Sequence, residues 1–183
     1  IRAYINEVIK MKKRTVALVI ACTLTITSGC MPQNGEPDNS TVDIQTTTPA
    51  TEYEKVSIYL PDENAQNLVS KEVQIEKNDE PMVELVQALV TEKALPAGTE
   101  VEKWSVSKDD APAVILDLNK AFADGILNSG STGELMMLGS LINTVWKYFE
   151  PASITLNVDG EPLETGHNIY DTPFTSPISL TNE

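Results

Sequence analysis

Residues 133–158 read GELMMLGSLINTVWKYFEPASITLNV, and the hydrophobic period of this stretch changes in the middle. Before Pro151, apolar side chains recur every three or four residues, which predicts one face of a helix. These residues are Leu135, Leu138, Ile142, Val145 and Phe149. After Pro151, the residues Ile154, Leu156 and Val158 alternate with polar ones, which predicts a strand with one buried face. A long helix that returns directly into a strand is typical of domains in which helices pack on a sheet.

Residues 129–134, SGSTGE, carry two patterns at the start of this helix. Ser131 and Glu134 have the S-x-x-E spacing of a capping box, in which each side chain satisfies a free backbone N–H group. The small residues before the helix could instead hold an anion at its N-terminus. No Gly-Lys-Ser/Thr sequence follows them, so the capping box is the preferred interpretation.

The residues upstream predict a second helix and further strands. Apolar and polar residues alternate in three segments that we expect to be strands, 56–60, 72–76 and 101–107. Asn78–Pro81 gives the second helix an acidic start and a proline in its first turn. Ala113–Leu118 is almost continuously apolar, which is typical of a central strand buried on both faces.

Short elements complete the predicted order of helices and strands. Residues 119–125 predict a short helix or turn, and Asp159-Gly160 predicts a tight turn into a short edge strand at 161–163. Two amphipathic helices can then cover one face of the strands. We therefore predict an α+β fold, a two-layer sandwich with a single mixed β-sheet and two main helices on one face.

Residues 11–30, MKKRTVALVIACTLTITSGC, have the anatomy of an export signal. Three basic residues follow Met11, and residues 16–26 form an apolar core of 11 residues. Such a run is shorter than the about 20 apolar residues that a membrane-spanning helix needs. Residues 1–10 precede the initiator candidate Met11 and are interpreted as a non-native or over-assigned start.

The signal ends in Thr27-Ser28-Gly29-Cys30, which resembles the lipobox of bacterial lipoproteins. In those proteins the cysteine thiol receives a diacylglyceryl group and becomes the first residue after cleavage. The resemblance therefore implies lipidation of Cys30 and a place on the extracytoplasmic face of the cell membrane. Thr27 departs from the aliphatic residue usual at its position, and plain secretion is the alternative. Cys22 would leave with the signal, so no disulfide is expected in the mature domain.

The rest of the chain divides by composition. Residues 30–53 are rich in proline, threonine, amide and acidic residues without an apolar period, which predicts a disordered tether. The signal peptide occupies residues 11–29. We expect the folded domain at 54–175 and a tail at 176–183.

The net charge limits the classes of partner that this domain can bind. The chain has a net charge of −14, and from residue 30 onward it contains eight basic and 26 acidic residues. Such a surface repels nucleic-acid phosphate, which binds proteins through lysine and arginine. We expect no nucleic-acid partner. The acidity either guides a basic partner or only keeps the domain soluble.

The sequence predicts no catalytic, cofactor-binding or metal-binding residues and no cofactor. His167 is the single histidine and lies in a Gly-His-Asn turn, so a surface or hydrogen-bonded turn residue is preferred over a ligand or general base. The acid pairs Asp62-Glu63 and Asp109-Asp110 could suggest glycosidase chemistry, which needs two carboxyl groups about 5–9 Å apart across a cleft. We expect solvated loop charges instead.

Two tryptophans and a methionine pair could be exposed anchors for a partner, because large side chains are enriched at interface hot spots. Trp104 shares a strand face with Val106, and Trp146 and Met136-Met137 lie on the long helix. Core packing is the preferred interpretation of each.

Several segments together resemble the GerMN domain of sporulation and spore germination proteins. The resemblance rests on Val56–Pro61, Leu95–Val101, Ala113–Leu118, Leu141–Val145, Phe149, Ile154–Gly160 and Gly166–Asp171. Glu150–Ser153 departs from the Pro-Gly-Val-like turn that is usual in that family. The resemblance covers roughly residues 54–175 and implies an α+β fold, frequent attachment to a lipoprotein signal and a role outside the cytoplasmic membrane. It implies no catalytic residues.

These observations predict a lipid-anchored extracytoplasmic GerMN-domain protein that is not an enzyme. Its role would be binding or scaffolding in sporulation, germination or cell-envelope assembly. It would attach to the membrane through its lipid and bind a protein or cell-wall partner. Two alternatives stay open, a cell-wall-acting envelope enzyme and a small solute-binding lipoprotein. A deep polar cleft with converging carboxylates would favour the enzyme, and a flat sheet or helix face would favour a binder.

Overall fold

The computed structural model describes residues 51–180, which belong to the second of two compact units of the chain, Thr47–Glu183. The predicted signal, Cys30 and most of the predicted tether lie outside the described residues. The elements are β1 (Tyr53–Pro61), β2 (Leu68–Glu76), α2 (Pro81–Thr91), β3 (Val101–Val106), β4 (Ala113–Leu118), α3 (Lys120–Leu127), α4 (Gly130–Phe149), β5 (Ser153–Val158), β6 (Glu161–Glu164) and β7 (Ile169–Tyr170).

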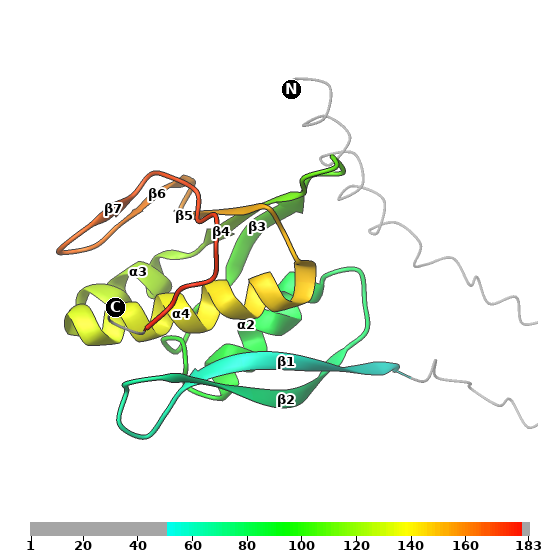
Figure 1. Cartoon of the computed structure of the whole chain (residues 1–183), viewed down its shortest axis with the longest axis horizontal. Helices are drawn as coiled ribbons and strands as arrows, with labels where there is room; N and C mark the ends of the chain where they lie inside the picture. The colour runs from blue at the N-terminus through cyan, green and yellow to red at the C-terminus, as the bar shows by residue number, and fades with distance from the viewer. Residues whose placement is uncertain (1–50, 181–183) are drawn as a thin grey trace, which may run out of the picture. The chain divides into compact units, whose positions relative to one another are not determined.

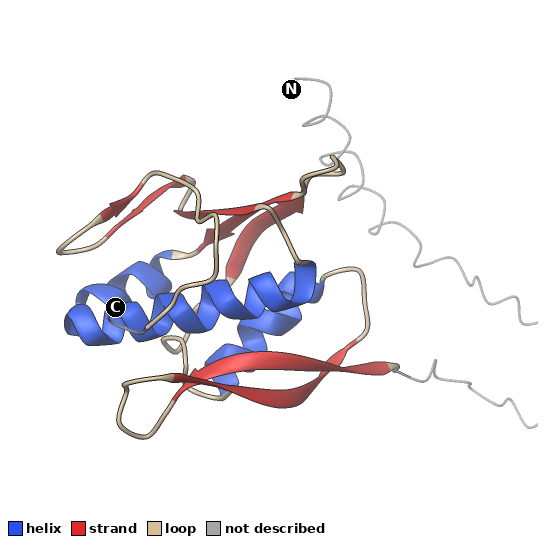
Figure 2. Ribbon diagram, in the orientation of Figure 1, coloured by secondary structure: helices blue, strands red, loops and turns tan. Residues whose placement is uncertain are grey.

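The helices lie between two β-sheets (Figure 1 and Figure 2). β1 and β2 form an antiparallel sheet of their own, and the other strands form a five-stranded sheet in the order β3-β4-β5-β6-β7. β4 and β5 are parallel and the other pairs are antiparallel, so this sheet is mixed. The α+β class and the mixed sheet are confirmed. The prediction of a single sheet in two layers is wrong, because the first hairpin forms a separate layer.

The extra layer follows from the burial of α4 on more than one face. Its buried residues are Glu134, Met136, Leu138, Gly139, Ser140, Leu141, Ile142, Thr144 and Val145. A helix that is buried on several faces must be covered from more than one side. The predicted stripe missed this second face because several of its residues are small or polar. Leu135, which the stripe included, is 41% exposed.

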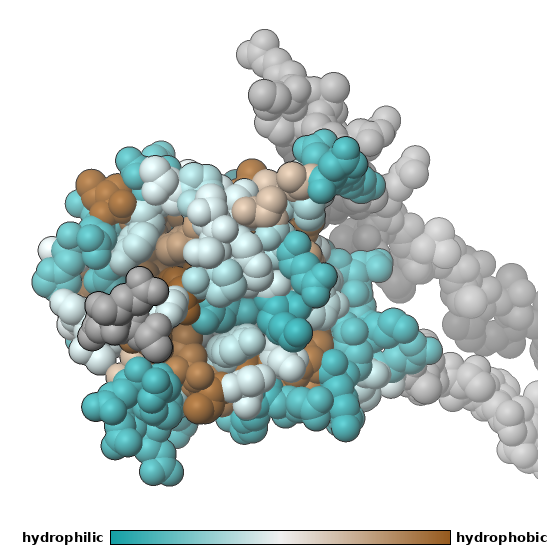
Figure 3. Space-filling model, in the orientation of Figure 1, coloured by the Kyte–Doolittle hydropathy of each residue, from teal (hydrophilic) through white to brown (hydrophobic). Residues whose placement is uncertain are grey.

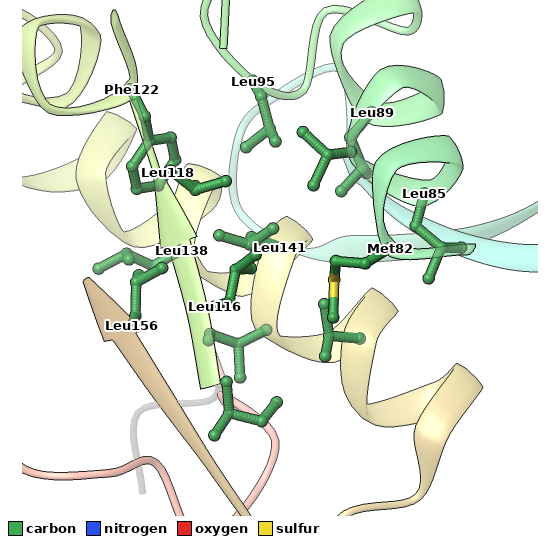
Figure 4. Close-up of a cluster of buried hydrophobic side chains, with 14 of the residues drawn as sticks. Met82, Leu85, Leu89, Leu95, Leu116, Leu118, Phe122, Leu138, Leu141 and Leu156 are labelled. Atoms are coloured by element: carbon green, nitrogen blue, oxygen red, sulfur yellow. The ribbon is translucent and has the colours of Figure 1, made fainter. Parts of the chain in front are cut away.

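One hydrophobic core joins the layers (Figure 4). Leucines of β4, β5 and α4 meet the apolar face of α2 in this core. The residues labelled in the view are Met82, Leu85, Leu89, Leu95, Leu116, Leu118, Phe122, Leu138, Leu141 and Leu156. Val56 and Ile58 add the buried side chains of β1. Burying apolar surface contributes about 25 cal/mol per Å², so this cluster is the main source of stability.

β4 has the predicted bounds but not the predicted burial. It is an interior strand, yet Ile115 is 47% exposed. Its cross-strand neighbours on this face are Ser105 of β3 and Thr155 of β5. The helices pack on the opposite face (Figure 1). The expectation of a strand buried on both faces is therefore wrong at Ile115, although Asp117 on the same face of β4 is buried.

The packed chain extends beyond the expected end at residue 175. Phe174 and Ile154 exchange two backbone hydrogen bonds, each of 2.8 Å. The side chain of Asn143 in α4 donates to the carbonyl of Ile178 at 3.0 Å and accepts from its N–H at 2.7 Å. The last described segment thus runs from the five-stranded sheet to α4 (Figure 1, red). Within residues 51–180, no helix is long and apolar enough to cross a membrane.

Candidate functional site

A pocket of about 210 Å³ lies where the first turns of α4 meet the β6–β7 hairpin. Ser131, Glu134, Leu135, His167, Asn168 and Tyr170 line it. In Figure 1 this is the left end of the domain, where α4 begins and the hairpin turns. Glu134 is the one carboxylate among the lining residues.

A tight turn brings β6 back along β5 and so positions this hairpin. Asp159 and Gly160 both have positive φ, 51° and 85°, as a two-residue hairpin turn requires. The N–H of Gly160 donates to the side chain of Asp117 at 2.9 Å, which ties the turn to β4. The predicted Asp159-Gly160 turn and the short strand after it are confirmed.

Thr165 organises the loop that connects β6 to β7. Its N–H donates to the carbonyl of Asn168 at 2.8 Å, and its Oγ1 accepts the N–H of Asn168 at 3.1 Å. The N–H of His167 lies 3.3 Å from the same oxygen. His167 is exposed at the edge of the pocket, where the sequence led us to expect a surface or hydrogen-bonded turn residue.

Glu134 is a buried carboxylate, with 4% of its surface exposed. Its Oε1 accepts three hydrogen bonds, from Tyr170 Oη at 2.5 Å, Thr165 Oγ1 at 3.1 Å and Asn168 Nδ2 at 3.3 Å. Burial acts to raise the pKa of Glu134, but these hydrogen bonds and the charge of His167 outweigh it, and the pKa is lowered. Glu134 therefore stays ionised inside the domain at neutral pH.

Tyr170 makes the shortest of these bonds and is itself held in place. Burial, followed by the hydrogen bond to Glu134 and its charge, raises the pKa of Tyr170 to about 12. Its ring stacks on Phe174, with centroids 5.8 Å apart and planes at 23°. Because Phe174 bonds to Ile154 of β5, the phenol is fixed to the sheet as a permanent donor at neutral pH.

The predicted capping box is wrong. α4 begins at Gly130, and Ser129 before it makes no side-chain cap. Its hydroxyl donates instead to the carbonyl of Ile126 at 2.7 Å. Glu134 turns toward the hairpin, where three donors converge on one oxygen. The sequence held a signal for this burial, because Glu134 is spaced four and seven residues from the buried Leu138 and Leu141.

A second groove, of about 320 Å³, lies between β2 and α2. Its three carboxylates belong to Glu76, Glu84 and Glu92. Glu92 pairs with Lys71 at 2.6 Å, and Glu84 accepts the side-chain amide of Asn78 at 3.0 Å. Two of the three carboxylates are thus already engaged at the surface.

The predicted acid pairs lie in loops. Asp62 shapes the β1–β2 turn by accepting the N–H groups of Gln66 at 2.8 Å and Asn64 at 3.2 Å. The bond from Gln66 is the main cause that lowers the pKa of Asp62. Asp109-Asp110 is exposed between β3 and β4. In the part of the chain that the structure describes, no group of three or more His, Cys, Asp or Glu residues could hold a metal ion.

The large side chains considered as anchors pack against the core. The indole N–H of Trp104 donates to Glu80 at 2.7 Å, and its ring lies 5.8 Å from that of Phe149. Trp146 and Met137 are partly buried against the core. Met136 is buried. Core packing is confirmed for all of them.

Comparison with solved structures identifies the same fold. The first GerMN domain of the sporulation protein GerM from Bacillus subtilis is 20% identical, with a TM-score of 0.51 over 69% of this chain and 94% of that chain. The tandem GerMN domains of the same protein give 20% identity and a TM-score of 0.52 over 70% of this chain and 45% of theirs. No curated protein matches the chain in sequence.

A family model settles the assignment that the fold suggests. The Germane model, described as sporulation and spore germination, matches residues 57–164. This range begins in β1 and ends with β6, so it includes Glu134 but stops before the loop that supplies the pocket's other wall. Since the match spans more than half of the sequence, the chain belongs to the Germane, or GerMN-domain, family of sporulation and spore germination proteins.

Proposed function

We propose that this chain is a lipid-anchored, extracytoplasmic binding module that acts in sporulation, germination or cell-envelope assembly without catalysing a reaction. The pocket between α4 and the β6–β7 hairpin carries the proposal. Exposed apolar side chains stand beside its buried carboxylate, Leu135 at 41% and Ile169 at 63% exposure. Figure 3 shows a hydrophobic patch over this hairpin within a largely hydrophilic surface. An apolar centre with a polar surround is the arrangement of a protein interface.

The alternative of a wall hydrolase finds less support in this geometry. Glycoside hydrolysis uses two carboxyl groups about 5–9.5 Å apart across a cleft. The pocket between α4 and the hairpin offers one carboxyl group. In the β2–α2 groove, two of the three carboxylates are already bonded, one to Lys71 and one to Asn78. A solute-binding lipoprotein would close two lobes around its ligand, whereas residues 51–180 share a single core.

The proposed location rests on the basic start, apolar segment and Ser-Gly-Cys30 ending of the export signal. Cys30→Ala should move the protein from the membrane fraction to the soluble fraction. Mass spectrometry of the membrane-extracted parent should identify a lipidated Cys30 as its first residue. A Cys30→Ala protein that stays as firmly bound as the parent contradicts lipid anchoring.

The proposed binding is tested by crosslinking in cells. A photoreactive amino acid replaces Ile169 or Leu135, and a third variant carries it at the exposed Glu102 on the opposite edge strand, β3. Adducts with one envelope protein should form from positions 169 and 135 and not from position 102. Turnover of cell-wall substrate that disappears in the Glu76→Gln/Glu84→Gln double variant would establish the enzyme instead.

A further inference from the structure

We propose that the Glu134 pocket is the receptor for a lysine side chain of a protein partner. The inference rests on the proposed binding function and names the chemistry that its site recognises. It starts from the unequal bonding of the two carboxylate oxygens of Glu134.

One oxygen of Glu134 is fully engaged and the other is left for a ligand. All three hydrogen bonds that Glu134 receives from the described residues go to Oε1. In residues 51–180, the fully buried side-chain nitrogen and oxygen atoms that lack a hydrogen-bond partner are Thr99 Oγ1 and Ser140 Oγ. Oε2 of Glu134 also lacks a partner within this range but is not among those atoms, so it is not fully buried. Since Glu134 lines the pocket, we assign Oε2 as the oxygen that a ligand in the pocket would reach. A largely desolvated anionic oxygen binds a cationic donor strongly.

The bonding pattern favours an ammonium group over a guanidinium group. Arginine binds a carboxylate best through two parallel N–H···O bonds, which need both oxygens. At Glu134 three donors already occupy Oε1. A lysine ammonium is a compact charge that can bond to Oε2 alone. The hydroxyl of Ser131 and the phenol oxygen of Tyr170, also in the lining, offer it further acceptors.

The walls fit the rest of a lysine side chain. Lysine places its carbon stem along apolar surface while its charged end seeks polar atoms. Leu135 supplies an apolar wall, and the exposed Ile169 follows Asn168 at the edge of the pocket. The volume of about 210 Å³ lies below the roughly 300–1,000 Å³ of sites for drug-sized ligands, so it suits the end of one side chain.

The charge of the domain favours a basic protein as the source of that side chain. Residues 51–180 contain eight basic residues, all lysine, and 22 acidic residues. Complementary charge speeds encounter and selects partners with the opposite sign. A wall glycopeptide can also present a primary amine, but it offers little apolar surface to Leu135 and Ile169. It is therefore the competing ligand in the test.

The test follows backbone and side-chain NMR signals of the full-length chain in detergent micelles. The probes are an acetylated Leu-Lys-Leu amide, its Leu-Arg-Leu twin and a muropeptide with a free amine. The lysine peptide should shift the signals of Ser131, Leu135, Asn168 and Tyr170. The arginine twin and the muropeptide should each bind at least about fivefold more weakly.

Glu134→Gln is the deciding variant, because the amide keeps an oxygen for the three donors and loses the charge. It should weaken binding of the lysine peptide at least about tenfold, as expected for loss of a charge-assisted bond. Glu164→Gln removes one charge from an exposed site on the adjacent strand and should leave binding unchanged. Equal binding by the parent and Glu134→Gln, no shift in the pocket, or tighter binding of the muropeptide would overturn the proposal.

The two proposals can fail separately. If crosslinking captures an envelope protein that binds Glu134→Gln as well as the parent, the binding function stands and the lysine receptor is refuted. If the lysine peptide fills the pocket as predicted but crosslinking from positions 135 and 169 yields no adduct, the receptor chemistry stands and the proposed binding function fails.

Discussion

The backbone N–H of Tyr59 in β1 donates a 2.9 Å hydrogen bond to Oγ1 of Thr144 in α4. Thr144 is fully buried. An edge strand carries N–H groups that another strand could pair with, and proteins commonly cover such edges. Here a helix side chain bonds to the outer edge of β1. The bond helps explain why the first hairpin packs against α4 and does not join the five-stranded sheet.

Replacing Thr144 by valine keeps the volume of the side chain and removes the hydroxyl. The N–H of Tyr59 is then left without its partner, so Thr144→Val should lower the free energy of unfolding by about 1–3 kcal/mol. Ser140→Ala is the matched control, because Ser140 is buried on the same helix and its hydroxyl has no partner among the described residues. Urea unfolding should show the control equal to or more stable than the parent. Equal losses in the two variants would contradict the role given to the bond.

Gly125 in α3 packs against a rigid neighbour. A Cβ atom at this position would lie 2.1 Å from Cγ of Pro96. At Gly139 in α4 it would lie 2.6 Å from Cδ1 of Leu68, the far end of a flexible side chain. Alanine gains up to about 1 kcal/mol of helix propensity over glycine at either site. We expect Gly125→Ala to be destabilising by about 1–3 kcal/mol net, because overpacking outweighs that gain.

The glycine comparison is read from thermal or urea unfolding of the two variants. Gly139→Ala should cost clearly less than Gly125→Ala, since Leu68 can change its rotamer and the ring of Pro96 cannot. A larger loss at Gly139 would show that α4 tolerates less movement of β2 than the geometry indicates.

Hydrophobic periodicity was sufficient to predict most elements, because burial repeats along a helix or strand. The strand at Ala113–Leu118 was located at its bounds, and the end of the long helix before Pro151 within one residue of its bound. The start of that helix was predicted two residues late, because Ser131 was taken as its cap. The separate first sheet was not predictable in this way. It depends on Gly139, Ser140 and Thr144, whose burial on α4 leaves no apolar pattern in the sequence.

The pocket was harder to predict, because its parts come from distant segments. The sequence drew attention to Ser131, Glu134 and His167, each for a local reason. Glu134 is linked to Thr165, Asn168 and Tyr170, which lie 31 to 36 residues away. Local spacing favoured a bond within the first helical turn, and the folded hairpin offered three donors instead. The one sequence signal for the burial of Glu134 was its spacing of four and seven residues from the apolar Leu138 and Leu141.

The lowered pKa of Glu134 predicts a loss of stability in acid. A carboxyl group whose pKa is lower in the folded than in the unfolded state stabilises the fold above the unfolded value. That value is 4.5 for Glu134, so its contribution is present above pH 4.5 and is lost as the pH falls through the lower folded value. The gap in unfolding free energy between the parent and Glu134→Gln should therefore narrow in acid. Urea unfolding from pH 7 to pH 3 measures this difference in free energy, and Glu164→Gln is the control for one lost charge. A difference that stays constant over this pH range would refute the predicted coupling between stability and the protonation of Glu134.

The raised pKa of Tyr170 predicts the opposite dependence in alkali. Its pKa increases from 10.0 in the unfolded chain to about 12 in the fold, so its contribution is complete below pH 10 and is lost as the pH rises toward 12. Tyr170→Phe removes this contribution and should cost about 1–3 kcal/mol at neutral pH, because Glu134 loses its closest donor. Tyr148, which donates to Glu54 at 2.8 Å and also has a pKa of about 12, must be separated from it.

NMR of tyrosine ring carbons makes that separation, with Tyr170→Phe and Tyr148→Phe assigning the two signals. In the parent the Tyr170 signal should titrate with a midpoint near 12. Burial, the largest cause of the raised pKa, is kept in Glu134→Gln, but the bond to the carboxylate and its charge are lost, so the midpoint should decrease. The Tyr148 midpoint should stay where it is in the same variant, since its partner is Glu54. A Tyr170 midpoint near 10 in the parent, or one that Glu134→Gln leaves unmoved, would mean that the 2.5 Å bond does not control the proton of this phenol.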